Sequence, residues 1–153
     1  MRVRFVPAGS LRGLEARTAF RDGFAEAVTP DGRLVARAPG RPSLLALLRR
    51  LGVRPITGQA PRTKAAVAAG SPFGVKVWRA CLDIPRGRTA TYGSLARKVG
   101  CGSARAIGGA LAANPLAGLI PCHRVVAADG PGGFAWGGER KRRWLRKEAR
   151  GAA

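Results

Sequence analysis

Apolar side chains recur at helical spacing through the second half of the chain. The first series runs from Phe73 through Val77 and Trp78. It follows Ser71-Pro72, in which serine is a favoured helix cap and proline a favoured first helical residue. Pro85-Arg86-Gly87 ends the series. The pattern therefore predicts a helix between these two prolines.

Two shorter helices are predicted next along the chain. Thr91 caps the first, which Gly100 stops, and Ser103 caps the second, which ends at Asn114-Pro115. Two short helices joined by a tight turn that contains glycine are typical of a helix-turn-helix.

Beyond Asn114 the pattern indicates shorter pieces. Leu119-Ile120 and Val125-Val126 are strand-like, and Pro131-Gly132-Gly133 is typical of a loop. A basic terminal helix is predicted from Glu139 to Glu148.

The first 70 residues carry a much weaker pattern. Ser43 to Leu51 predicts a helix with Ser43 as N-cap and Gly52 as stop, and Phe20 to Val35 predicts two short strands around Pro30-Asp31-Gly32. Residues 58–70 are expected to be a linker. The expected fold class is α/β. A small, poorly patterned N-terminal α/β segment (1–70) precedes a mainly helical C-terminal domain (71–153) with a helix-turn-helix and a cysteine-bearing loop.

Composition and charge limit what such a chain can be. Hydrophobic residues make up 46% of its 153 residues, which is enough for a core. The net charge of +20 attracts phosphate backbones or anionic membranes and resists self-association, so a monomer is expected. No apolar run approaches the roughly 20 residues that span a bilayer, and the start lacks the features of a secretory signal. We expect a cytoplasmic protein without membrane contact, associated with the nucleoid if it is bacterial.

Three cysteines and one histidine offer few options for a metal. Cys81, Cys101 and Cys122 form no Cys-x-x-Cys pair, so a zinc site is not expected. Three reduced thiols are expected instead, with Cys81 packed in a core.

Cys122 stands next to His123, the only histidine in the chain. A buried cysteine usually serves as a small apolar residue, but a neighbouring imidazole and nearby arginines can stabilise a thiolate. Adjacent residues of an extended chain point to opposite faces, so a direct Cys122–His123 pair is disfavoured. Contact would need a kink, which Pro121 can help to set, or a bridging water.

His123 is either a histidine satisfied in the core or a general base. A base needs an orienting partner, and the acidic candidates in this half are Asp129 and Glu148. Asp129 precedes Gly130 and is explained more simply as a turn residue.

Two groups of basic residues can meet a polyanion. Arg105 lies among alanines and glycines, which either leave it solvated or let its helix approach a duplex while the side chain enters the base stack. The run from Arg140 to Arg143 is expected to be a solvated basic face, whose functional interpretation is nonspecific phosphate attraction.

An ordered series of motifs links the segment from Phe73 to Glu148 to one protein family. The shared motifs are Phe73-x-x-x-Val77-Trp78, Ile84-Pro85-x-Gly87-x-Thr89, Thr91-Tyr92-Gly93-x-Leu95-Ala96, Ala104-Arg105-Ala106-Ile107-Gly108-x-Ala110, Asn114-Pro115-Leu116, Ile120-Pro121-Cys122-His123-Arg124-Val125-Val126, Gly133-Phe134-Ala135-Trp136-Gly137 and Lys141-x-x-x-Leu145-x-x-Glu148. With these motifs the segment resembles the O6-alkylguanine-DNA alkyltransferases, also called methylated-DNA–protein-cysteine methyltransferases, in the style of their adaptive-response branch.

The resemblance implies a DNA repair protein that is consumed in a single turnover without a cofactor. Cys122 would take the alkyl group from a flipped guanine, because the O6 substituent is inaccessible inside the stack. His123, oriented by Glu148, would take the thiol proton through a water. Asn114 would brace the active-site turn, and Tyr92 would hydrogen-bond the flipped base or a phosphate.

The same resemblance implies how the substrate is held. The partner would be double-stranded DNA that contains O6-alkylguanine, with Arg105 filling the vacated stack. The other DNA-binding residues would be Tyr92, Thr91, Ser103, Ala106 and Gly109, and the guanine would be bound by the backbone of Cys122 and by Val125, Trp136 and Ala135.

Departures from the family pattern keep other functions open. The turn from Gly100 to Ala104 is one residue shorter than usual, Ala117 stands where many relatives have a second proline, and residues 1–70 show little of the family's N-terminal domain. The main alternative is a non-catalytic alkyltransferase-like protein that flags alkylated DNA, although that class lacks the thiol of Cys122. An architectural DNA-binding protein would leave the Cys122 motif unexplained, and a thiol hydrolase fits poorly with one histidine and a charge of +20.

Overall fold

The computed structural model describes residues 1–151, which fold as two compact units. Unit 1 contains residues 1–72 and 115–119, and among the described residues unit 2 contains 73–114 and 120–151. The return of residues 115–119 to unit 1 has no signature in the sequence. It places the segment just before the Cys122 motif in unit 1 and the motif itself in unit 2.

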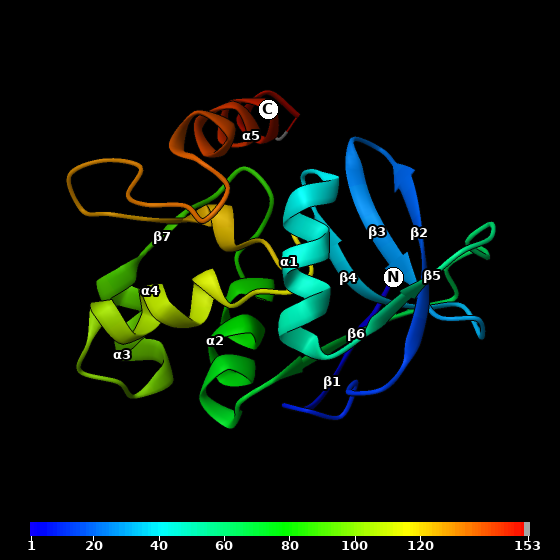
Figure 1. Ribbon diagram of the computed structural model, residues 1–153. Coiled ribbons are helices and arrows are strands. Elements are labelled where there is room, and N and C mark those ends of the chain that lie inside the picture. Colours follow the sequence, from blue (N-terminus) through cyan, green and yellow to red (C-terminus); the bar gives the residue numbers. More distant parts are fainter. Residues whose placement is uncertain (152–153) are drawn as a thin grey trace. The chain divides into compact units, whose positions relative to one another are not determined.

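Unit 1 is built on a six-stranded mixed sheet (Figure 1). The strands follow the order β1-β6-β4-β3-β2-β5. β2, β3 and β4 form an antiparallel meander, while β1 and β4 pair with β6, and β5 with β2, in parallel. The strands are β1 (Val3–Pro7), β2 (Glu15–Arg21), β3 (Phe24–Val28), β4 (Arg33–Ala38), β5 (Arg54–Ile56) and β6 (Ala65–Gly70).

One helix, α1 (Arg41–Leu51), packs on β3 and β4 of this sheet. Its buried face carries Leu44, Leu47 and Leu48. These leucines join a core in which the sheet contributes mainly small side chains, among them Ala16, Ala25, Ala27, Val35, Ala36, Ala38, Val67 and Ala69. The α/β fold class expected from the sequence is therefore confirmed, with far more order in the first 70 residues than their pattern indicates.

The alanine content explains why the sheet is hard to see in the sequence. β6 is Ala-Ala-Val-Ala-Ala-Gly, and alanine and glycine are depleted in strands generally. The prediction of a linker over residues 58–70 is wrong for this strand, which pairs with both β1 and β4. The strand lies between β1 and β4, and four of its six residues are buried.

Turns and caps in unit 1 differ in detail from the prediction. The turn around Pro30-Asp31-Gly32 is present between β3 and β4, but a further hairpin joins β2 to β3 through Asp22-Gly23. Both of its central residues have positive φ, 51° and 81°, as a two-residue hairpin turn requires. The predicted N-cap Ser43 is wrong, because α1 begins two residues earlier with Gly40 as its cap. The stop at Gly52 is confirmed.

Unit 2 is mainly helical. It contains α2 (Pro72–Leu82), β7 (Ala90–Thr91), α3 (Tyr92–Val99), α4 (Ala104–Ala112), a 3-10 turn η1 (Cys122–Arg124), β8 (Val125–Val126) and α5 (Gly138–Gly151). The predicted caps of the helix-turn-helix are confirmed. Thr91 accepts a hydrogen bond from the backbone N–H of Ser94 within a capping box, and Ser103 accepts one from that of Ala106. Gly100 ends α3 in the left-handed conformation.

The chain around Cys122 is not extended, contrary to the expectation from the sequence. Cys122 to Arg124 form the single turn η1, and Leu119-Ile120 is not a strand. Only Val125-Val126 forms a short strand, which pairs in parallel with β7. Pro121 precedes the turn, and the backbone N–H of Arg124 donates to its carbonyl. The kink considered for Pro121 is therefore present.

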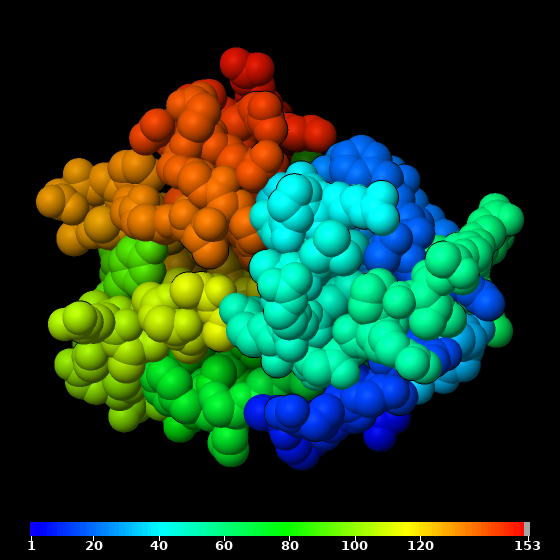
Figure 2. Space-filling model, viewed as in Figure 1, coloured from blue at the N-terminus to red at the C-terminus, as the bar shows by residue number. Residues whose placement is uncertain are grey.

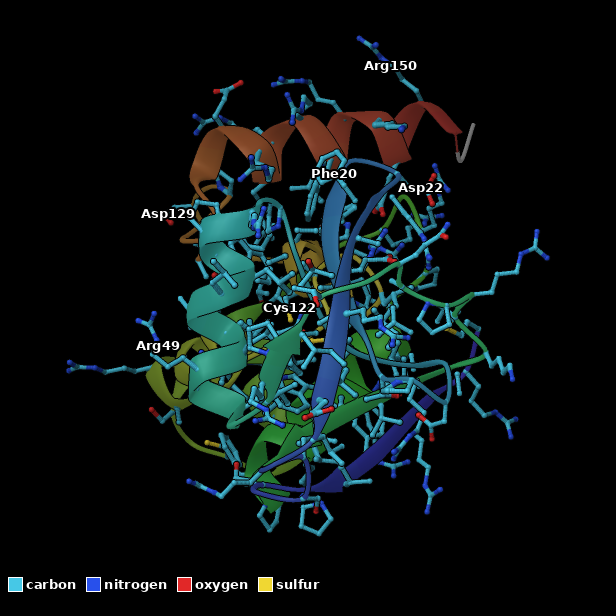
Figure 3. All side chains as sticks on the ribbon, turned by 45° about the vertical axis from the view of Figure 1, so that its right-hand side comes forward. Phe20, Asp22, Arg49, Cys122, Asp129 and Arg150 are labelled. Atoms are coloured by element: carbon cyan, nitrogen blue, oxygen red, sulfur yellow. The ribbon has the colours of Figure 1, made fainter. Side chains whose placement is uncertain are left out.

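Basic side chains project from the surface of both units. Arg49 of α1 and Arg150 of α5 point away from the protein, whereas Cys122 lies in the interior (Figure 3). The outer side of α5 and the loop that precedes it are at the surface in the space-filling view (Figure 2). Within residues 1–151 there is no helix long and apolar enough to cross a membrane.

The boundary and core of α1 can be tested by two neighbouring substitutions. Leu44→Ala removes a fully buried side chain and should lower the free energy of unfolding by about 2–5 kcal/mol. Ser43→Ala should change it by less than about 0.5 kcal/mol, because Ser43 is exposed and makes no cap. Urea denaturation followed by circular dichroism measures both. A loss of about 1 kcal/mol for Ser43→Ala would instead restore Ser43 as the cap.

Candidate active site

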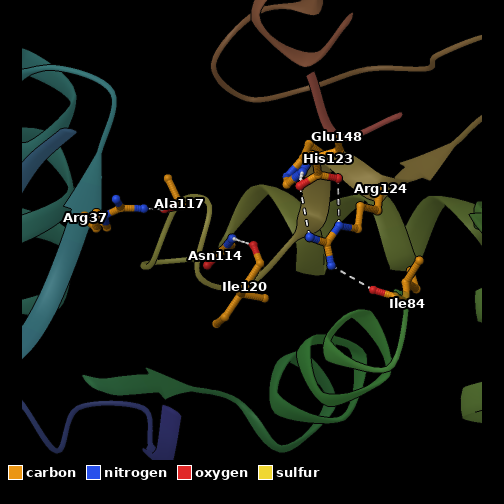
Figure 4. Close-up of polar contacts among 8 residues, drawn as sticks. All are labelled: Arg37, Ile84, Asn114, Ala117, Ile120, His123, Arg124 and Glu148. Atoms are coloured by element: carbon orange, nitrogen blue, oxygen red, sulfur yellow. Dashed lines mark hydrogen bonds and ion pairs between the residues drawn. The ribbon is translucent and has the colours of Figure 1, made fainter. Parts of the chain in front are cut away.

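Cys122 begins the 3-10 turn η1 and is almost completely buried, with 3% of its surface exposed. The side-chain amide of Asn114 donates to its Sγ at 3.1 Å. It also donates to the carbonyl of Ile120 at 3.0 Å (Figure 4). Asn114 is itself 1% exposed. One amide therefore both closes the segment between residues 114 and 120 and donates to the sulfur, which supports the predicted bracing role of Asn114.

The Cys122 thiol is kept protonated by its surroundings. Burial raises the pKa of Cys122 well above its usual value, and the neighbouring thiol of Cys81 raises it further. The amide of Asn114 and the charge of Lys141 oppose this effect and favour the thiolate. Cys81 is fully buried, as expected from the sequence.

The carboxylate of Glu148 binds two residues of η1 (Figure 4). Nε2 of His123 lies 2.8 Å from its Oε1, and Arg124 donates to both of its oxygens at 2.9 Å. A third guanidinium bond, of 2.8 Å, reaches the carbonyl of Ile84. Burial raises the pKa of Glu148, but the hydrogen bonds from Arg124 and His123 outweigh it and lower the pKa to about 2.

This contact determines which nitrogen of His123 carries the proton. Burial lowers the pKa of His123 more than Glu148 raises it, so the imidazole is neutral near pH 7. An ionised carboxylate only accepts hydrogen bonds, so Nε2 must donate to Glu148. Nδ1 is then the basic nitrogen, and it is buried without a partner among the described residues. Glu148, and not Asp129, orients the imidazole, because Asp129 lies in a turn.

Lys141 is a residue of the site that sequence reasoning missed. Its side chain is fully buried, and its Nζ donates to the carbonyls of Val125 at 2.5 Å and Gly133 at 2.9 Å. Burial lowers its pKa to about 8, while Cys122 raises it. The expectation of a solvated basic face from Arg140 to Arg143 is therefore wrong for Lys141. One sequence feature could have indicated that Lys141 belongs to the site. Lys141 lies seven residues before Glu148, which places both residues on one face of α5.

A pocket of about 250 Å³ opens beside the thiol. Tyr92 lies on one wall, and its hydroxyl donates to the carbonyl of Gly133 at 3.0 Å. Burial raises the pKa of Tyr92, and so does the nearby Cys122. The pocket is lined by Tyr92, Gly108, Leu111, Ala112, Cys122, Gly133, Phe134 and Ala135. It therefore joins the thiol to α4 of the helix-turn-helix and to the loop before α5.

The predicted DNA-binding residues divide into two groups. Arg105 and Gly109 are exposed on α4, and Ala106 is half-buried beside them. The hydroxyls of Thr91 and Ser103 are engaged as helix caps. Ser103 is nevertheless exposed, and a capping hydroxyl that accepts a hydrogen bond keeps its own proton to donate.

The predicted guanine-binding residues lie on two segments. Val125 is buried, and its carbonyl already accepts from Lys141, although a carbonyl has a second lone pair. Ala135 is exposed at the pocket, and Trp136 is half-buried next to it. No group of three or more metal-binding side chains occurs in the part of the chain that the structure describes.

The fold and the site together are those of a helix-turn-helix protein with a candidate cysteine-based active site. The sequence profile described as "6-O-methylguanine DNA methyltransferase, DNA binding domain" matches residues 72–150, which is just over half of the chain. The chain belongs to this family.

Curated relatives are similar over the same half. A protein of Acanthamoeba polyphaga mimivirus named probable methylated-DNA–protein-cysteine methyltransferase is 47% identical over 77 residues, which are 50% of this chain and 51% of that protein. The Escherichia coli bifunctional transcriptional activator/DNA repair enzyme Ada is 46% identical over 91 residues, 58% of this chain and 26% of that one. The matched residues therefore span at most about half the length of these relatives.

Solved structures match more of the chain than the sequences do. The Mycobacterium tuberculosis protein named OGT, crystallised in complex with DNA, superimposes with a TM-score of 0.67 at 28% identity, over 90% of this chain and 94% of that one. The O6-methylguanine-DNA methyltransferase of Pyrococcus kodakaraensis gives a TM-score of 0.60 at 27% identity, over 88% and 98%. Because the matches cover about nine tenths of the chain, they extend into residues 1–70, where the sequence pattern is weak.

The low pKa of Glu148 predicts a pH-dependent contribution to stability. A carboxylate whose pKa falls from 4.5 to about 2 on folding stabilises the protein above pH 4.5, and loses that contribution as the pH drops toward 2. The full contribution is about 3 kcal/mol. Glu148→Gln should therefore be less stable than the unchanged protein at pH 6, with the gap closing below pH 4.5. Urea denaturation at several pH values measures this, and a gap independent of pH would refute it.

Proposed function

We propose that this protein repairs O6-alkylguanine in duplex DNA by transferring the alkyl group irreversibly to Cys122. The observation that carries the proposal is the arrangement of three groups. The Cys122 thiol lines the pocket, Asn114 donates to its sulfur, and His123 has a basic nitrogen left free by its bond to Glu148. Membership of the family supports the choice of substrate.

The transfer is an in-line displacement at the alkyl carbon. The sulfur of Cys122 forms a bond to that carbon while the carbon–O6 bond breaks, and the electron pair leaves with the guanine. The thiol proton passes to Nδ1 of His123 through a water, and the departing guanine takes one proton from the hydroxyl of Tyr92 or from solvent, which returns it to its normal form. Glu148 stabilises the imidazolium that results, because its carboxylate is ionised and only 2.8 Å away.

A flipped base is needed because the O6 group is inaccessible in the stack. The pocket of about 250 Å³ has mostly apolar walls and a single phenol, that of Tyr92, which suits a planar base with polar edges. In this proposal Arg105 enters the duplex and fills the gap, which its exposed position on the first turn of α4 supports.

The reaction ends with a thioether on the protein. A thioether is a poor leaving group, so each chain acts once. No cofactor is needed in this scheme, because the alkyl carbon is already electrophilic and the sulfur is the final acceptor. We expect the protein to act as a monomer.

Mass spectrometry of the protein after mixing with a duplex oligonucleotide carrying one O6-methylguanine tests the proposal. We expect a gain of one methylene, confined to the peptide with Cys122 and saturating at one per chain. Cys122→Ala should gain nothing while still binding the duplex. The peptides with Cys81 and Cys101 serve as internal controls, and methylation spread over all three would show chemical alkylation instead.

The second candidate is a non-catalytic protein that binds alkylated DNA and signals to other repair. The raised pKa of the buried Cys122 thiol favours it, since a poorly activated thiol would not react. A folded protein that prefers the damaged duplex but gains no methylene would establish this function. Absence of both the gain and the preference would leave a basic DNA-binding protein.

The role of Arg105 can be separated from that of overall charge. Arg105→Ala should slow transfer roughly tenfold or more, because holding a duplex unstacked costs a few kcal/mol. Arg49→Ala removes the same charge from an exposed position of α1 and should have little effect. Single-turnover rates at one salt concentration measure both. Equal losses in the two variants would show that Arg105 contributes charge alone.

A further inference from the structure

One face of α5 carries three side chains of the site. Lys141, Trp144 and Glu148 are spaced at i, i+3 and i+7, which places them in a row on a helix. Lys141 and Glu148 make the polar contacts described above. Trp144 contacts the ring of His123 edge to face, with 5.2 Å between ring centroids and 83° between planes.

The same indole contacts the loop before α5. Phe134 lies 5.6 Å from Trp144 at 74°, and 5.2 Å from Trp136 at 87°, measured between ring centroids and planes. Phe134 also lines the pocket beside the Cys122 thiol. Trp144 thus contacts the imidazole on one side and an aromatic residue of the pocket wall on the other.

We propose that Trp144 is a positioning residue, which fixes the plane of the His123 imidazole and ties it to the aromatic wall of the pocket. The proposal rests on the proposed function, because the orientation of a base matters only if that base accepts the thiol proton.

The hydrogen bond to Glu148 cannot position His123 alone. It fixes Nε2 at 2.8 Å from the carboxylate but leaves the ring free to turn about that axis. Turning the ring would change the direction in which Nδ1 points. An edge-to-face contact has an angular preference that comes from the ring quadrupole, so Trp144 supplies the missing constraint. Leucine is apolar but smaller, and it has no ring quadrupole to supply this preference.

Trp144 also keeps water from the imidazole. The charged groups that act on His123 are Glu148 and Lys141 from α5 and Arg124 from its own turn, and the Cys122 thiol precedes it in η1. Burial is the largest cause of its lowered pKa. A smaller side chain at position 144 would admit water and let the pKa of His123 rise.

The test compares Trp144→Leu and Trp144→Phe with the unchanged protein in single-turnover transfer from O6-methylguanine DNA between pH 5 and 8. Trp144→Leu should be slower by roughly 2- to 12-fold, which corresponds to the free energy of one aromatic pair. As the pH is lowered, the rate of Trp144→Leu should begin to fall at a higher pH than the rate of the unchanged protein, because the pKa of its His123 is higher. Trp144→Phe keeps a ring and should restore most of the rate. Phe20→Leu, an exposed aromatic position of unit 1, is the matched control.

Tryptophan fluorescence gives a readout that does not depend on transfer. A protonated imidazole quenches an indole that it contacts, so emission should fall as the pH drops through the pKa of His123. The transition should be lost in Trp144→Phe and kept in Trp136→Phe. Circular dichroism over the same pH range confirms that each variant stays folded.

Rates and pH profiles of both Trp144 variants that equal those of the unchanged protein would overturn the proposal. So would equal slowing of both variants with an unchanged pH profile, because that result indicates packing alone. If the unchanged protein transfers nothing, the proposed function fails and the positioning role fails with it. The fluorescence transition would then still report whether Trp144 contacts His123, which separates that failure from an error in the contact itself.

Discussion

The carboxylate of Glu148 is the group on which the rest of the site depends. It accepts two hydrogen bonds from Arg124 and one from His123, and Arg124 also donates to the carbonyl of Ile84 just after α2. One acid therefore connects α5, the turn η1 and the end of α2. Without it Arg124 would remain as a largely buried charge without its ionic partner, which is costly. The same bond leaves Nδ1 as the basic nitrogen of His123, so Glu148 also sets the tautomer that the proposed reaction uses.

Burial changes the pKa values of both Cys122 and Lys141, and so determines which of them carries a proton near neutral pH. The pKa of the thiol is raised and that of the lysine is lowered to about 8, so near neutral pH the sulfur stays protonated beside a cation. A protonated thiol is a weak nucleophile toward stray electrophiles. In the proposed reaction, the thiol becomes a nucleophile only when its proton passes to His123. The protein is proposed to react only once. A protonated thiol therefore prevents that single reaction from occurring with an electrophile other than the substrate.

The sequence predicted the parts whose chemistry is local. The caps Thr91 and Ser103, the stop at Gly100 and the terminal helix follow from residue types at fixed spacing, and all are present. Two strands between Phe20 and Val35 were predicted, but the rest of the sheet of unit 1 was not, because many of its buried positions are filled by alanine, which carries little strand signal. Lys141 escaped because a basic run is usually solvated, and only the fold shows that one member of the run is enclosed by carbonyl groups.

Unit 1 contains the five residues that lie between Asn114 and Ile120 in the sequence. Residues 115–119 belong to unit 1, where the backbone of Arg37 bonds to Pro115 and Ala117 and its guanidinium donates to the carbonyl of Ala117 at 2.7 Å. That guanidinium also stacks on Phe24, 3.6 Å from the ring centroid, and pairs with Glu26. Both ends of the segment are joined by the Asn114 amide, which also donates to the Cys122 sulfur. Within unit 1 these contacts with the sheet therefore fix the path of residues 115–119, the segment that precedes the active-site turn in the chain.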